Sequence, residues 1–166
     1  MENIVMEKLR EWLLEAERIA IIGIGNPILM DDSVGIKVTQ DLKGKVSSKV
    51  LLIECEITPE NYLQEITDFK PTHILIIDAA MLSLKPGEIA IFKLEDLDMN
   101  NIFSTHFLPI RLFCEYITRA LDTEVKLLLI QPKQIDFGED LSPEVSLSKE
   151  KVVKLILSAL LTKKPS

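Results

Sequence analysis

Cysteine and basic residues are both scarce in this sequence. Its 166 residues include two cysteines, Cys55 and Cys114, which lie far apart and form no Cys-x-x-Cys pair. This pattern favours a reducing setting, so we expect a cytoplasmic protein. Lysine and arginine number 19 against 26 aspartates and glutamates, which gives a net charge of −7. Such a charge argues against nucleic acid or an anionic membrane as a partner, because phosphate binding requires a basic surface.

Long apolar segments are also absent. No window approaches the roughly 20 apolar residues that a membrane-spanning helix needs. Charged residues are spread over the first 17 positions, so we expect no signal peptide there. The sequence contains no repeat, no low-complexity tract and no interior linker. Apolar residues still make up 47% of the chain, which is enough for one packed domain over residues 1–166.

Continuous apolar runs alternate with amphipathic segments. The continuous runs predict buried parallel strands, and apolar residues at three- and four-residue steps predict helices. Strands are expected at 18–25, 49–54, 72–78 and 125–130, with an alternating edge strand at 88–94. Helices are expected at 1–17, 32–42, 59–69, 108–121 and 148–161, the last with Ser148 as its N-cap. This alternation predicts a three-layer α/β/α domain with a mostly parallel central sheet and one antiparallel edge strand.

Two glycines end the first predicted strand, in Gly23-Ile24-Gly25. Glycines in this place are typical of dinucleotide-binding loops, but those loops need a third glycine three residues later. Ile28 stands at that position, and the carboxylates of Asp31 and Asp32 would repel a phosphate at the start of the next helix. The loop therefore favours a metal ion or a polar substrate group as its ligand.

Carboxylates follow the ends of two predicted strands. One member of the Asp31-Asp32 pair is enough to cap a helix N-terminus, which leaves the other free to face a cleft. Asp78 ends the apolar run 74–77, where a carboxylate without a partner would be unfavourable; a helix cap or a loop salt bridge is the structural alternative. Ligands of such sheets bind beyond the carboxyl ends of the strands, so we expect Asp32 and Asp78 to share a site.

Histidine is as scarce as cysteine. His73 begins a predicted strand and so points to the opposite end of the sheet, whereas His106 directly precedes the helix predicted at 108–121. A single histidine in such a place is usually an ordinary polar residue. Together with Asp32 and Asp78, however, His106 completes a set of two carboxylates and one imidazole. This set suits nickel, zinc or another divalent ion and leaves a coordination position open.

The segment Glu54-Cys55-Glu56 ends the second predicted strand at the same end of the sheet. The two glutamates should raise the thiol pKa of Cys55, which argues against a thiolate nucleophile and favours a buried small residue. Glu54 is the better candidate for lining the cleft. In the loop 137–145, Phe137 and Leu141 could pack over the cleft mouth, or the loop could be a plain surface connection.

A series of motifs occurs in an order and spacing typical of one known family. The motifs are Gly-Ile-Gly-Asn at 23–26, Asp-Asp at 31–32, Pro-Thr-His-Ile-Leu-Ile-Ile-Asp at 71–78, Lys-Pro-Gly-Glu-Ile at 85–89, Ser-Thr-His at 104–106, Ile-Gln-Pro at 130–132 and Phe-Gly-Glu-Asp-Leu-Ser-Pro-Glu-Val at 137–145. Together they resemble the [NiFe]-hydrogenase maturation proteases, particularly the hydrogenase-3 type endopeptidases. The resemblance runs from about Ile19 to Lys154, so the helix at 1–17 lies outside it.

The resemblance implies a specific activity. It implies an endopeptidase that removes the C-terminal extension of a [NiFe]-hydrogenase large-subunit precursor after nickel insertion. The family's catalytic and metal-contacting positions fall on Asp32, Asp78 and His106. The nickel is expected to arrive with the substrate, and zinc or another divalent ion is the alternative.

The chain departs from the family pattern at two places. The family usually has Asp-Gly-Gly-Thr where this chain has Glu54-Cys55-Glu56-Ile57, and this loop is linked to substrate recognition and cleavage. It also usually has glycine at the positions of Met30 and Ser33. These departures leave open a peptidase for another metalloprotein, or a non-catalytic module of the same fold that binds a metal or a precursor.

Overall fold

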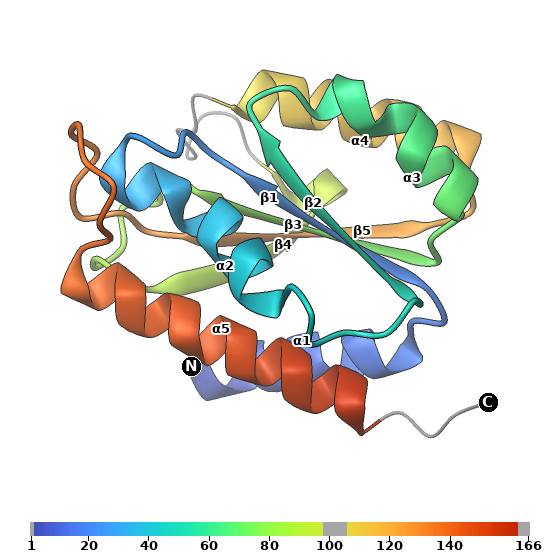
Figure 1. Cartoon of the computed structure of the whole chain (residues 1–166), viewed down its shortest axis with the longest axis horizontal. Coiled ribbons are helices and arrows are strands. Elements are labelled where there is room, and N and C mark those ends of the chain that lie inside the picture. The colour runs from blue at the N-terminus through green and yellow to red at the C-terminus, as the bar shows by residue number, and fades with distance from the viewer. Residues whose placement is uncertain (1, 98–105, 163–166) are drawn as a thin grey trace.

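The computed structural model describes residues 2–97 and 106–162. Its centre is a five-stranded sheet with the strand order β2-β1-β3-β5-β4 (Figure 1). The parallel strands are β1 (Ile19–Ile24), β2 (Val50–Glu56), β3 (His73–Ala79) and β5 (Glu124–Ile130), and β4 (Ile89–Lys93) runs antiparallel to β5. The predicted α/β fold, with its mostly parallel sheet and antiparallel edge strand, is confirmed.

The described part of the chain places helices on both faces of the sheet (Figure 1). One face carries α1 (Glu2–Glu15), α2 (Val34–Leu42) and α5 (Pro143–Leu161), and the other carries α3 (Leu63–Phe69) and α4 (Phe107–Ala120). Short 3₁₀ helices lie at η1 (Met30–Ser33), η2 (Pro59–Tyr62) and η3 (Leu94–Asp96). Within these residues no helix is both long and apolar enough to cross a bilayer.

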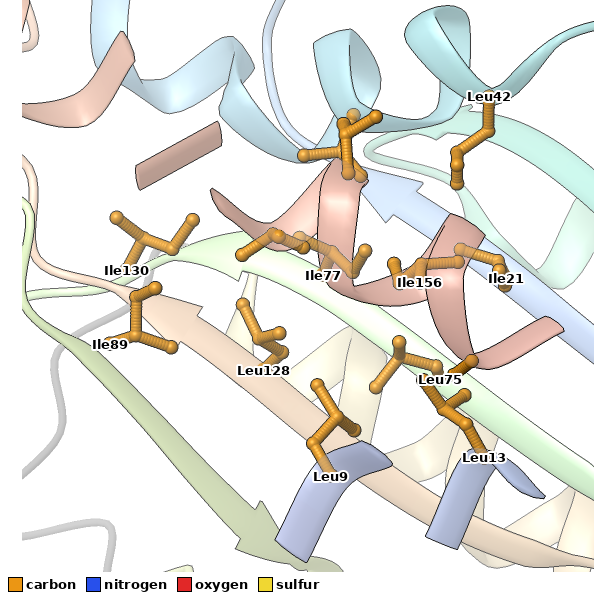
Figure 2. Packing of buried hydrophobic residues seen from close by; sticks show 14 of the residues in the cluster. Leu9, Leu13, Ile21, Leu42, Leu75, Ile77, Ile89, Leu128, Ile130 and Ile156 are labelled. Atoms are coloured by element: carbon orange, nitrogen blue, oxygen red, sulfur yellow. The ribbon is translucent and has the colours of Figure 1, made fainter. Parts of the chain in front are cut away.

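The isoleucine-rich strands supply two apolar layers, one on each face of the sheet. Side chains alternate along a strand, so Leu75 and Ile77 of β3 pack with α1, α2 and α5, whereas Ile74 and Ile76 pack with α3 and α4. Figure 2 shows the first layer, in which Ile156 of α5 belongs to the same cluster as Ile77. The central strands are thus buried on both faces, as their continuous apolar runs predict.

Helix α2 and η1 lie directly against the backbone of the sheet because glycines remove the side chains that would hold them away. A Cβ atom at Gly35 would lie 2.1 Å from the carbonyl oxygen of Ile77. One at Gly25, where φ is +146°, would lie 1.8 Å from the carbonyl oxygen of Asp32. The segment that carries Asp31 and Asp32 therefore lies directly against the backbone of Gly25.

Two local predictions are wrong. The strand predicted at 49–54 was expected to be buried, but β2 is an edge strand with half-buried residues along most of its length. The last helix was expected to begin at Ser148, but α5 begins at Pro143 with Ser142 at the N-cap position. Proline suits the first turn of a helix because its missing N–H would have no partner there. Ser148 instead lies within α5 and its hydroxyl donates to the carbonyl oxygens of Glu144 and Gly87.

Candidate metal centre

Asp32, Asp78 and His106 converge at the carboxyl ends of β1 and β3. One potential ligand atom from each residue lies within 4.8 Å of those from the other two. Asp32 lies in η1, Asp78 is next to last in β3, and His106 directly precedes α4. The three residues predicted from strand ends and residue type are therefore neighbours in space, although 74 positions separate the first from the last.

The carboxylate of Asp32 is held from two sides. The residue is 6% exposed, and its Oδ2 accepts a hydrogen bond of 2.8 Å from the backbone N–H of Asn26. The same oxygen lies 3.2 Å from Nε2 of His106. The close approach of η1 to Gly25 sets this geometry, since the backbone of Asp32 occupies the position of the missing Cβ.

Two carboxylates raise the pKa of His106. Burial by itself lowers its pKa, but the hydrogen bond with Asp32 and the negative charges of Asp78 and Asp32 raise it by more, so the net pKa lies above the ordinary histidine value. The two carboxylates thus favour the protonated form of the imidazole, whereas burial disfavours it. A divalent ion would have to displace that proton, because a protonated imidazole nitrogen cannot act as a ligand.

Asp78 is fully buried at the end of an apolar strand. Its Oδ1 accepts a hydrogen bond of 2.9 Å from the backbone N–H of Ala79. The side-chain alternation of β3 directs it to the face that carries α3 and α4, where its charge acts on both His106 and Cys55. The alternative of a helix cap is excluded, because β3 continues to Ala79 and no helix follows directly.

The donor set fits a single divalent ion. Metal–ligand distances to histidine nitrogen and carboxylate oxygen are about 2.0–2.2 Å, so two donors on one ion lie at most about 4.4 Å apart. The observed spacing of up to 4.8 Å closes to that value with a side-chain shift of under about 1 Å. Two carboxylates and one imidazole suit nickel or zinc and leave at least one position for a substrate atom or water.

The segment Glu54-Cys55-Glu56 divides between the two faces of the sheet. The carboxylate of Glu54 accepts a hydrogen bond from Gln40 of α2 and pairs with Lys43, which directly follows that helix. Burial raises the pKa of Glu54, but these contacts lower it by more, and the net pKa is below its ordinary value. Glu54 therefore contacts α2 rather than the side chains of the metal centre.

Cys55 faces the opposite side and is 1% exposed, packed in the apolar layer of α3 and α4. Burial, more than the neighbouring charges of Glu60, Asp78 and Glu56, raises the pKa of its thiol to about 12. The predicted direction of this shift is confirmed, and burial is its larger cause. A register shift between β1 and β2 lies beside Cys55, because Gly23 pairs with Glu54 and the next residue of β1 pairs with Glu56.

Asp31 has a role that the sequence argument missed. No side-chain cap is formed at the start of η1 or α2; the fully buried Asp31 carboxylate instead binds the loop that follows β5. Its Oδ2 accepts from the N–H groups of Lys133 and Gln134 and from the hydroxyl of Ser142, at 2.9, 3.0 and 2.8 Å. Its Oδ1 accepts from the N–H of Ser142 at 2.7 Å. The only sequence signal was the second carboxylate of the Asp31-Asp32 pair.

The loop after β5 does not cover the cleft as proposed. Leu141 packs against the apolar layer of α1, α2 and α5. The side chain of Phe137 is 84% exposed and projects into solvent.

Comparison with known proteins identifies one family. The family model described as "Hydrogenase maturation protease" matches residues 36–159. A Methanocaldococcus jannaschii protein named as a candidate hydrogenase maturation protease is 36% identical and covers 96% of both chains. The hydrogenase 3 maturation protease of Escherichia coli K12 is 28% identical over 70% of this chain and 74% of its own.

The same family appears among solved structures. The crystal structure of a [NiFe] hydrogenase maturation protease from Thermococcus kodakarensis KOD1 superposes with a TM-score of 0.85 at 31% identity, and covers 93% of this chain and 99% of its own. A crystal structure of the hydrogenase 3 maturation protease gives a TM-score of 0.72 at 26% identity, with 82% and 87% coverage.

Proposed function

Because this chain belongs to the hydrogenase maturation protease family, and is thus a peptidase that processes a hydrogenase precursor, we propose that it removes the C-terminal extension of a [NiFe]-hydrogenase large subunit after nickel insertion. The observation that carries the proposal is the convergence of Asp32, Asp78 and His106 within 4.8 Å at the carboxyl edge of the sheet. Nothing else in the described chain brings three such groups together.

The proposed catalytic site uses these three side chains as metal ligands. The Asn26 N–H orients the carboxylate of Asp32, and the strand end holds Asp78 in a place from which water is largely excluded. His106 contributes Nε2, the nitrogen that already faces Asp32. A divalent ion bound there supplies Lewis acidity to the scissile carbonyl or to an attacking water molecule.

Nickel carried by the precursor is the proposed ion, with zinc or another divalent ion as the alternative. Three protein ligands form an incomplete coordination sphere, so an ion already bound to the precursor can be shared between the two proteins. A precursor without nickel would offer no such link. This provides a physical reason for cleavage after nickel insertion and not before it.

The test is cleavage of a nickel-loaded large-subunit precursor, followed by mass spectrometry of its C-terminus. The wild-type chain should remove the extension from the loaded precursor and leave the nickel-free precursor intact. Asp32→Asn, Asp78→Asn and His106→Gln should each abolish cleavage, because each replaces a carboxylate or imidazole ligand by a neutral amide, which is a much weaker donor to such an ion. Asp68→Asn, at an exposed position on α3, is the matched control and should cleave normally.

A non-catalytic binding module is the rival, and the departure at Glu54-Cys55-Glu56 is what favours it. It predicts a stable complex with an intact precursor. Full cleavage by all three ligand variants would refute the proposed chemistry, and a bound but uncut precursor would support the rival.

A further inference from the structure

The loop after β5, residues 131–142, is tied to the segment that carries Asp32. Besides the four hydrogen bonds accepted by Asp31, the N–H of Met30 donates to the carbonyl oxygen of Gly138 at 2.8 Å. The N–H of Gly138 in turn donates to the carbonyl oxygen of Ile28 at 2.9 Å. Lys37 of α2 also donates to the carbonyl oxygen of Glu139. So many contacts hold the loop in one conformation relative to the metal centre.

This well-held loop exposes its most apolar side chain. Phe137 is 84% exposed, the largest exposed fraction among the large apolar residues of the described chain. Ile135 on the same loop is also exposed. An aromatic ring gains much from leaving water, and a residue whose loop is already held in place loses less conformational entropy when a partner covers it.

Further exposed apolar residues lie at the same edge of the sheet. Ile28 follows β1, Ile57 follows β2 and Met81 follows β3. We call these three residues, with Ile135 and Phe137, the apolar rim. Parallel strands end at one edge, so the rim residues lie around the end of the sheet that holds Asp32, Asp78 and His106.

We propose that Phe137 is a docking residue for the hydrogenase precursor, and that Asp31 is the positioning residue that holds Phe137 in place. The inference rests on the proposed function, since it identifies part of the surface that the same site presents to its substrate. A polypeptide whose scissile bond reaches Asp32 must lie across loops at this edge of the sheet, and the loop of Phe137 is bonded to the residues next to Asp32. The chemistry of the rim selects an apolar side chain in the precursor segment beside the cleaved bond.

The first test compares Phe137→Ala with wild type on the nickel-loaded precursor. Truncation of a buried aromatic anchor weakens an interface by more than about 1.4 kcal/mol, which is ten-fold in affinity. We therefore expect KM for the precursor to rise at least ten-fold, with kcat and nickel affinity unchanged. Leu161→Ala is the matched control, because Leu161 is also strongly exposed but lies at the far end of α5 (Figure 1). An unchanged KM in Phe137→Ala would overturn the proposal.

The second test asks whether Asp31 acts through Phe137. An asparagine side chain accepts hydrogen bonds at only one of its two terminal atoms, because the other is an NH2 group that donates. Asp31→Asn therefore places a donor against the N–H donors of the loop and should also raise KM for the precursor. In the double variant, adding Asp31→Asn to Phe137→Ala should raise KM by less than a further two-fold, because the docking residue that Asp31 positions is gone. If the fold-changes in KM of the two single variants instead multiply in the double variant, Asp31 has a general structural role and the positioning assignment is overturned. Ser142→Ala, which removes one donor, provides a milder variant if Asp31→Asn does not fold.

Direct binding measurements separate this inference from the proposed function. If wild type cleaves the precursor and Phe137→Ala binds it equally well, the docking residue is refuted and the function stands. If wild type binds the precursor without cutting it, and Phe137→Ala weakens that binding ten-fold, the docking residue stands and the function is refuted. Self-association of the free chain that Phe137→Ala abolishes, without any effect on precursor binding, would assign the rim to a second copy and overturn the proposal.

Discussion

Substitution of Gly35 by alanine tests how closely α2 must approach the sheet. Gly35 lies in the first turn of α2, and a Cβ atom there would meet the carbonyl oxygens of Ile77 at 2.1 Å and Ile24 at 2.7 Å. Ile77 precedes Asp78 directly, and α2 is continuous with the η1 segment that carries Asp32. The added methyl group therefore pushes apart the two elements that hold the carboxylates of the candidate metal centre.

The magnitude follows from two opposing effects. Alanine in place of glycine normally stabilises a helix by up to about 1 kcal/mol. Ordinary carbon–oxygen contacts are about 3.3 Å, so the contact at 2.1 Å requires a backbone shift of more than 1 Å. Overpacking of this kind costs about 1–3 kcal/mol. We expect the upper value, because the atoms that the added methyl group meets belong to the backbone of two strands and cannot rotate away. The net loss should be about 2 kcal/mol, or about 4–8 °C in Tm for a chain of this size.

The assays are urea unfolding and nickel titration calorimetry on the same preparations. Gly35→Ala should lower the urea midpoint without changing the slope of the transition. The proposed nickel binding should also weaken by ten-fold or more, because displaced supporting residues typically reduce metal affinity by about 10–100-fold. Gln40→Ala, at an exposed position of the same helix, removes only a solvent-exposed hydrogen bond with Glu54 and should change the free energy of unfolding by less than about 0.5 kcal/mol.

A Gly35→Ala variant that is as stable as wild type, or more stable, would refute the reasoning. It would mean that helix propensity outweighs contact with the sheet, and that the glycines do not set the position of η1. Reduced stability with unchanged nickel affinity would refute only the link between α2 and the metal centre.

Two further predictions concern protonation and backbone strain. Because the pKa of His106 is raised, the proposed nickel affinity should fall as the pH drops through that pKa. The stability that protonated His106 gives the metal-free protein has the opposite trend: it is complete below about 6.5 and is lost as the pH rises through the pKa of the folded state. Calorimetry and urea unfolding across pH, each compared with His106→Gln, check both trends, and a wild type whose nickel affinity does not change with pH would contradict them. Glu56 has a left-handed backbone with φ of +53°, so Glu56→Gly should raise the free energy of unfolding by up to about 1 kcal/mol. Glu56→Ala keeps the strain and should show no such gain in thermal unfolding; equal stability of the two variants would contradict the strain argument.

The strands were predictable because their signal is local. Burial on both faces demands continuous apolar runs such as 74–77, and such runs are visible without any knowledge of partners. Asp32 and Asp78 followed from the same reasoning, since residues after parallel strands meet at one edge. The exposure of β2 was not predictable in this way, because position within the sheet depends on the pairing order of strands and not on the strand itself.

The amino-acid order by itself determined which segments become strands, which end of the strands carries the candidate site, and which three side chains are suited to a shared ion. These features depend only on hydrophobic pattern, strand direction and residue type. Tertiary structure alone decided that Asp31 holds the loop of Ser142, that Glu54 contacts α2, and that Phe137 stays in solvent. The physical reason is that hydrogen bonds and burial link residues more than 100 positions apart, and no local pattern records which distant partner the folded chain brings into contact.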